Sequence, residues 1–173
     1  MIKVIQELQP RVGNLIPTGD LDYLAFITQA NITDTTQREA LEYLVTETKA
    51  RGLWDLSKAI YPIVGGNENA HKLNLKDPRD LDEAFRLTLN GTFTHDSDGM
   101  INTAGTANYA DTHLVPSVDL IRDSTHMSFY SKTAGSFIST EMGSSGVNYS
   151  DGTYIAINYS GDRYYTVSGG TDI

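Results

Sequence analysis

The chain has 173 residues, a net charge of −9 at neutral pH, 39% hydrophobic residues and no cysteine. This length suits one domain or two small ones, and the acidic balance argues against unspecific binding to nucleic acid or anionic membranes. The lack of Cys excludes disulfides and thiolate chemistry, and no apolar run reaches the roughly 18 residues that a membrane span requires.

Residues 1–19 mix apolar side chains with Pro10, Gly13, Pro17 and Gly19, which interrupt any long helix. We expect an extended or irregular lead-in, because such a segment cannot form a core of its own. It would pack either on the rest of this chain or on a partner protein. The side chains of this predicted attachment interface are Val4, Ile5, Leu8, Val12, Leu15 and Ile16.

Three short helices are predicted next, and together they form a small bundle. Asp20 caps the first, over Leu21–Ala30, and Asp34 with Gln37 forms a capping box at the start of the second. Gly52 suits the left-handed cap after the second helix. The third helix is predicted over Leu53–Tyr61 and ends at Pro62. The predicted core of the bundle consists of Trp54, Leu56, Ile60 and Tyr61, with Leu41, Leu44 and Val45 opposite.

From Ala84 onward the apolar residues alternate, which is typical of half-buried strands. Asn90-Gly91 predicts a hairpin between the first two strands. A second hairpin is predicted at Ser160-Gly161-Asp162. The segments expected to form strands are 85–90, 92–95, 113–115, 127–132, 137–138, 154–159 and 163–167. Short strands at this spacing favour an antiparallel β-sandwich, so the fold class is α+β with a helical bundle before the sandwich.

One ordered string of residues between Gly52 and His95 resembles a module of bacteriophage virion proteins, especially fibres and related appendages. In that family a helical adaptor precedes a β-sandwich of the concanavalin A/laminin G type, a jelly roll. The matching residues are Gly52, Trp54, Ala59–Pro62, Val64–Gly66, His71, Lys72, Asn74–Lys76, Pro78, Ala84–Leu87, Asn90, Gly91, Thr94 and His95. Of these, the motif or core residues singled out are Trp54, Tyr61, Pro62, Gly65, Gly66, His71, Phe85 and His95.

The resemblance implies a structural role in a virion, on the head or on the tail. It implies that residues 1–19 attach the chain to capsid or tail proteins, that residues 20–78 form the adaptor, and that residues 79–173 form the sandwich. The β-rich part would then project, assemble into a homo-oligomer (a trimer or dimer), or bind a host-surface glycan. Fewer strands are found than a complete sandwich needs, so we expect either a longer chain or strands supplied by other subunits.

Candidate chemistry is sparse in this sequence. The four histidines have no metal-ligand spacing, and the resemblance assigns His71 and His95 to the structural motif. Asp96 and Asp98 with Gly99 form the one loop that suggests a Ca²⁺ site. It lacks the acidic residue at the bidentate position and the flanking helices of an EF-hand, so we interpret it as an acidic turn. We therefore predict neither a cofactor nor a metal.

Two rival functions follow from other features. A carbohydrate-binding module would use late Tyr rings, such as Tyr130 and Tyr154, to stack on sugars, although Tyr is also a common strand residue. An enzyme such as a depolymerase would need two carboxylates set across a cleft, and no pair stands out. The sequence therefore favours a virion structural protein that acts by binding and assembly.

Overall fold

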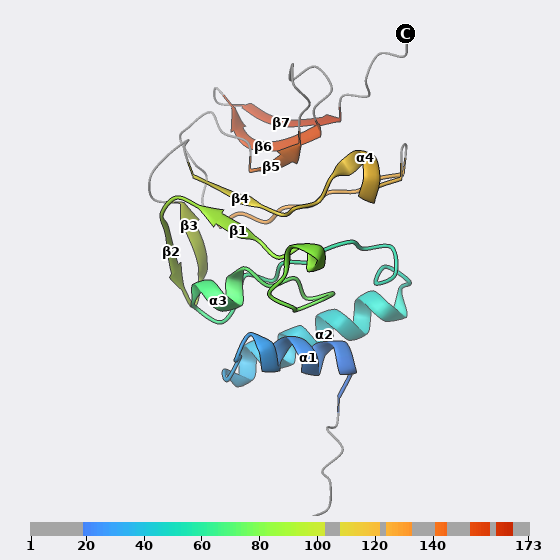
Figure 1. Ribbon diagram of the computed structural model, residues 1–173, viewed down its shortest axis with the longest axis vertical. Coiled ribbons are helices and arrows are strands. Elements are labelled where there is room, and N and C mark those ends of the chain that lie inside the picture. The colour runs from blue at the N-terminus through green and yellow to red at the C-terminus, as the bar shows by residue number, and fades with distance from the viewer. Residues whose placement is uncertain are drawn as a thin grey trace, which may run out of the picture.

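The computed structural model describes residues 19–102, 108–121, 124–132, 141–144, 153–159 and 162–167. The protein is mixed α+β with small antiparallel sheets (Figure 1). The helical elements are α1 (Leu21–Gln29), α2 (Thr35–Ala50), α3 (Glu68–His71), the 3-10 turn η1 (Asp82–Ala84) and α4 (Pro116–Asp119). The strands are β1 (Thr88–Asn90), β2 (Phe93–Asp96), β3 (Gly99–Asn102), β4 (Tyr109–Asp111), β5 (Met142–Ser144), β6 (Thr153–Tyr159) and β7 (Asp162–Val167).

Both predicted helix caps at the start of α1 and α2 are confirmed. Asp20 accepts a hydrogen bond from the backbone N–H of Asp22, and Asp34 accepts one from that of Gln37, at 2.9 Å and 2.8 Å. The capping box is only half formed, because the Gln37 side chain does not bond the backbone N–H of Asp34. Its Oε1 instead accepts the N–H of Gly65. Gly52 has the predicted left-handed conformation, with φ of 68°.

The predicted third helix at Leu53–Tyr61 is wrong. The segment makes one turn, in which the N–H of Ser57 donates to the carbonyl of Leu53, and then extends. It cannot continue as a helix because the N–H of Ile60 donates to the Asn74 side chain and its carbonyl accepts the N–H of Leu75. Leu56 is consequently 80% exposed and does not belong to the core.

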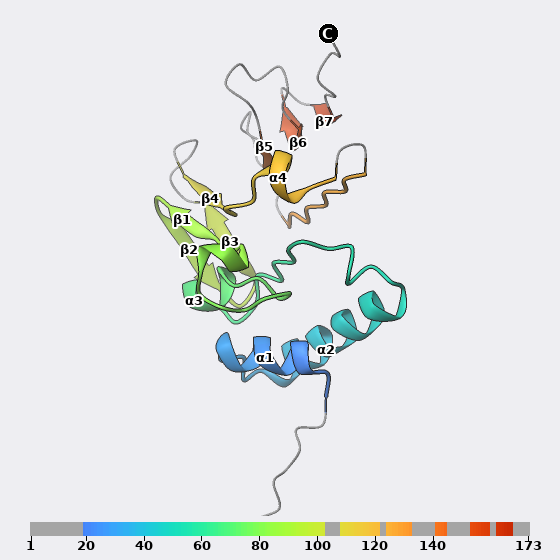
Figure 2. The same ribbon diagram turned by 45° about the vertical axis from the view of Figure 1, so that its right-hand side comes forward.

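The main hydrophobic core lies between the α1–α2 pair and the segment that follows α3. Figure 2 shows the two helices side by side beneath this segment. Burial of Trp54 and of Leu41 and Val45 on α2 is confirmed, and Leu44 is partly buried. The buried members of this cluster are Tyr23, Phe26, Ile27, Ala30, Ile32, Leu41, Val45, Trp54, Ala70, Leu73 and Leu75. Leu24, Leu44, Ile60 and Val64 pack against them.

A buried amide, that of Asn74, joins three segments of the chain around this core. Its Nδ2 donates to the carbonyl of Ala84, and its Oδ1 accepts the N–H groups of Ile60 and Lys76, all within 3.1 Å. The N–H of Leu87 also donates to the carbonyl of Lys72, at 2.7 Å. Hydrogen bonds therefore connect both sides of residues 76–79, where the boundary between the adaptor and the β domain was predicted.

The strand pairing differs from the sequence prediction around Asn90-Gly91. β1 pairs with β4, in the register Leu89↔Ala110, while β2 pairs with β3 through the turn at Ser97 and Asp98. The predicted hairpin does not form because a type I′ turn needs positive φ at both central residues, and only Gly91 of this pair has it.

The later part of the chain confirms one predicted hairpin and corrects two predicted strands. β6 and β7 pair as predicted, and β5 joins them in a three-stranded sheet. Residues 113–115 and 127–132 are not strands, and His113 has a φ of 57°, which a strand does not allow. Phe137 and Ile138 lie outside the described residues. The described strands form two two-stranded sheets and one three-stranded sheet, not two large sheets packed face to face.

Candidate functional site

The main finding at the motif residues is a contact between His71 and His95. The His71 ring, from α3, is fully buried, and its Nδ1 lies 3.0 Å from Nδ1 of His95, on β2. The pKa of His71 is lowered to about 4, chiefly by burial and also by the nearby His95, while Asp96 opposes the shift. The Nε2 atom of His71 is buried without a hydrogen-bond partner in the described structure. Sequence reasoning gave no reason to expect this pairing, since the two residues are 24 positions apart.

Tyr61 and Phe85 form a second contact between distant motif residues. The Tyr61 hydroxyl donates to the Phe85 carbonyl, at a residue that ends η1 in the left-handed conformation. Burial raises the pKa of Tyr61, and the negative charge of Asp111 adds to this shift. The hydroxyl therefore stays protonated and acts as a donor that fixes the chain at Phe85.

The two motif glycines both have positive φ, and at Gly65 a side chain would also not fit. Gly65 has a φ of 94°, and a Cβ atom there would lie 2.6 Å from Ile32 Cδ1 and 2.7 Å from Ala70 Cβ. Gly66 has a φ of 70°, and its Cβ would lie 3.4 Å from the backbone of Asp96 and Ser97. The turn after the half-buried Pro62 thus needs glycine at position 65 for both conformation and close packing, and at position 66 for conformation.

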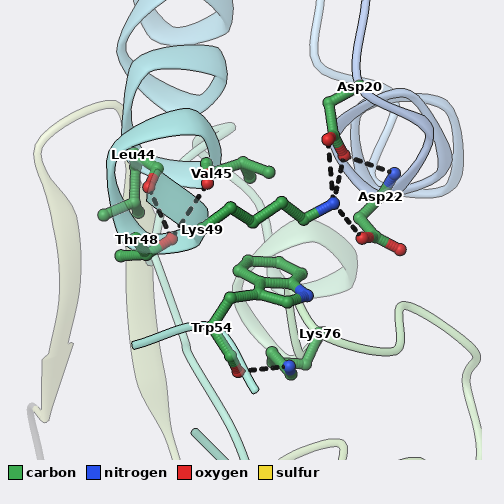
Figure 3. A network of polar contacts seen from close by, with 8 residues as sticks. All are labelled: Asp20, Asp22, Leu44, Val45, Thr48, Lys49, Trp54 and Lys76. Atoms are coloured by element: carbon green, nitrogen blue, oxygen red, sulfur yellow. Dashed lines mark hydrogen bonds and ion pairs between the residues drawn. The ribbon is translucent and has the colours of Figure 1, made fainter. Parts of the chain in front are cut away.

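Trp54 is surrounded by charges rather than open to a ligand (Figure 3). The ammonium groups of Lys49 and Lys76 lie 5.0 Å and 4.4 Å from its ring centroid. Figure 3 shows the two Lys groups on either side of the indole, with Lys49 turned toward Asp20 and Asp22 on the α1 side and Lys76 donating to the Trp54 carbonyl. Because Trp54 is only 7% exposed, it offers no open face on which a sugar could stack.

The ion pair between Lys49 and the α1 carboxylates shifts the pKa values of Asp20 and Lys49 in the stabilising direction. The hydrogen bond from Lys49 lowers the pKa of Asp20. Burial alone would lower the pKa of Lys49, but its bonds to Asp20 and Asp22 outweigh burial and raise it. Lys76 has a lowered pKa, chiefly because it is partly buried. This network ties α1 and α2 to the Trp54 segment.

Two depressions lie beside these contacts. One, of about 370 Å³, is lined by Asp22, Lys49, Gly52, Trp54 and Asp55. The other, of about 220 Å³, lies next to the His71–His95 contact and is lined by Glu68, Leu89, Gly91, Thr92, Phe93 and His95. Neither depression has the nucleophile, base and oxyanion donors that catalysis requires.

Asp96 and Asp98 lie at the β2–β3 turn, where their oxygens have partners within the protein. Asp96 Oδ1 accepts the N–H of Asp98 at 2.8 Å, and Lys132 Nζ lies 3.1 Å from Asp98 Oδ1. Among the residues that the structure describes, no group of three or more His, Asp or Glu side chains could hold a metal ion.

Two sets of predicted residues cannot be placed. The attachment residues Val4, Ile5, Leu8, Val12, Leu15 and Ile16 all lie outside the described ranges. Of the late tyrosines, Tyr130 is 83% exposed, whereas the side chains on β6 and β7 are not described, apart from the buried Ile155. Within the described ranges no helix is long and apolar enough to cross a membrane.

No family model, curated protein or solved structure matches this chain. The functional class of the protein is therefore inferred from the motif residues and their contacts.

Proposed function

We propose that this chain is a structural subunit of a bacteriophage virion, in a fibre or appendage of the head or the tail. One observation carries the proposal: the ordered string between Gly52 and His95, which resembles the adaptor of such proteins, has its residues in mutual contact. His71 contacts His95, Tyr61 contacts Phe85, and Gly66 packs against the end of β2. These residues hold the backbone in place, which suits a structural adaptor and not a catalytic centre.

In this proposal residues 1–19 attach the chain to capsid or tail proteins, and the β-rich part projects from the particle. The strands would belong to a concanavalin-like sandwich that further strands complete, from the same protein or from other copies. The small sheets support this reading, because isolated two-stranded sheets are only marginally stable in water. A homo-oligomer, dimer or trimer, would supply the missing contacts.

The solution mass of the chain, measured by light scattering over a range of concentrations, tests this proposal. A discrete trimer or dimer is the expected result, because fibres gain stability and avidity from copies held together. A monomer that persists at high concentration would contradict the homo-oligomer, and the fibre proposal would lose its main support.

A carbohydrate-binding module is the second candidate, and the exposed Tyr130 ring next to the half-exposed Phe129 favours it. Such a module would bind glycans without turnover and without a virion. A glycan array, probed with and without Ca²⁺, tests this alternative. Binding lost in Tyr130→Ala but kept in Tyr43→Ala, a control at another exposed Tyr on α2, would favour it over the fibre proposal.

A further inference from the structure

The histidine contact joins two elements that belong to different parts of the fold. His71 ends α3, which packs on the α1–α2 core through Ala70, and His95 lies in the middle of the β2–β3 hairpin, opposite Met100. Gly66 lies at the same junction, because a Cβ atom at this position would lie 3.4 Å from the backbone of Asp96 and Ser97. The orientation of the hairpin on α3 therefore depends on a small set of contacts around one ring pair.

Few other charges face the two rings. Glu68 from α3 lines the same depression as His95, and Asp96 from β2 acts on His71. The neighbouring charges are already paired, since Lys72 bonds to Asp80 and Lys132 bonds to Asp98. The rings therefore have two carboxylates nearby but no direct ion-pair partner among the described side chains.

The geometry limits how many protons the pair can hold. With both rings neutral, one Nδ1–H donates to the other Nδ1. One added proton is tolerated, because a charged ring still donates to an unprotonated Nδ1 opposite it. A second proton would place two N–H donors and two positive charges 3.0 Å apart, so the hydrogen bond would be lost and the rings would repel.

We propose that the His71–His95 contact is an acid-sensitive latch, which holds the β2–β3 hairpin on α3 and releases it when the pair takes up its second proton. The latch is built into the fold, and it does not depend on the fibre assignment. Releasing the hairpin would also open the depression between Glu68 and His95.

The pH window of this latch follows from the environment of His71. Its pKa is about 4 in the closed form and returns toward the ordinary 6.5 when the ring reaches water. The open form therefore binds more protons between these values, so acid favours opening in that window. The Asp20–Lys49 ion pair persists there, because the pKa of Asp20 lies below its ordinary value.

Hydrogen exchange of the full chain, measured by mass spectrometry from about pH 7.5 to about pH 4.5, tests the latch. After correction for intrinsic exchange, protection of residues 93–102 should fall by about tenfold per pH unit below pH 6.5, while protection of α2 is retained. Nitrogen NMR of the histidine rings should show His71 neutral as long as the hairpin is protected.

Two variants separate the latch from general acid unfolding. His95→Gln keeps an acceptor for the His71 N–H but removes the second ring that can take up a proton. Hairpin protection should then fall less steeply with acid than in the parent chain, because only the burial of His71 remains to drive opening. His126→Gln, at an exposed position, should behave as the parent chain does. Hairpin protection that is constant with pH, or lost together with α2, would overturn the proposal. If His95→Gln does not fold, nitrogen NMR of the parent chain still tests the proposal. A His71 ring that becomes charged while the hairpin remains protected from exchange would overturn it.

Discussion

Single residues in this protein act mainly by fixing the backbone, and the two loop glycines at positions 65 and 52 show how context decides their importance. Both have positive φ, so both favour glycine. They differ in their surroundings, because a Cβ at Gly65 would collide with Ile32 and Ala70, whereas a Cβ at Gly52 meets nothing within 4 Å.

Gly65→Ala should therefore destabilise the protein by about 3 kcal/mol, because left-handed strain adds to overpacking. Gly52→Ala is the matched control and should cost about 1 kcal/mol, from the strain alone. Urea denaturation of both variants, followed by circular dichroism, measures the difference. Equal losses would mean that the contacts around Gly65 relax without cost.

The amide of Asn74 provides a second prediction at this scale. In Asn74→Asp the side chain loses its donor, so the buried Ala84 carbonyl is left without its partner and faces another acceptor. We expect a loss of about 2–4 kcal/mol at neutral pH. Asn69→Asp, on an exposed site of α3, is the control and should change stability by less than about 0.5 kcal/mol. A small effect at Asn74 in the same urea assay would contradict its assigned role.

The buried histidine makes global stability depend on pH. The folded-state pKa of His71 is lowered to about 4, so its contribution is fully present above about pH 6.5 and is lost as the pH falls toward 4. One pKa unit corresponds to about 1.4 kcal/mol, so the loss between pH 7 and pH 5 should be about 2 kcal/mol. Urea titrations at the two pH values measure it. A His126→Gln variant should lose the same amount, because that side chain is exposed.

At the scale of elements, the adaptor and the first hairpin behave as one unit. Tyr61 contacts Phe85, Lys72 contacts Leu87, and His71 contacts His95. Cutting the chain at the predicted boundary near Pro78 would therefore remove the second residue of each pair. We expect residues 1–78 to fold poorly and residues 1–111 to give a cooperative thermal transition with α2 protected from exchange. A stable, cooperative fragment 1–78 would place the boundary where the sequence suggested.

The elements that sequence reasoning predicted correctly are those set by local chemistry. Asp20 and Asp34 cap helices within three residues of themselves, and β6 pairs with β7, the strand that follows it directly. The failures arise where a distant partner decides the conformation. Ile60 leaves the expected helix because Asn74 binds its N–H, and β1 pairs with β4 rather than with the next strand.

The candidate site shows the same limit. The burial of Trp54 could be predicted from its apolar neighbours, but the Lys49 and Lys76 groups over its ring come from separate elements. The pairing of His71 with His95 likewise has no short-range signal, since it depends on how the hairpin meets α3. The resemblance singles out residues by their order along the chain, whereas only the fold shows which of them are in contact.

At the scale of the whole molecule, the charge of −9 per chain constrains how copies could assemble. Bringing like-charged subunits together costs electrostatic free energy, which falls as added salt shortens the screening length to about 8 Å at physiological ionic strength. If the protein forms the proposed homo-oligomer, its association should therefore strengthen with salt. We expect the concentration of half-dissociation, measured by sedimentation or light scattering, to fall severalfold between about 20 mM and 150 mM NaCl. An association that weakens with salt would instead indicate that opposite charges dominate the contacts between copies, and a sodium sulfate series at matched ionic strength would separate screening from strengthened apolar burial.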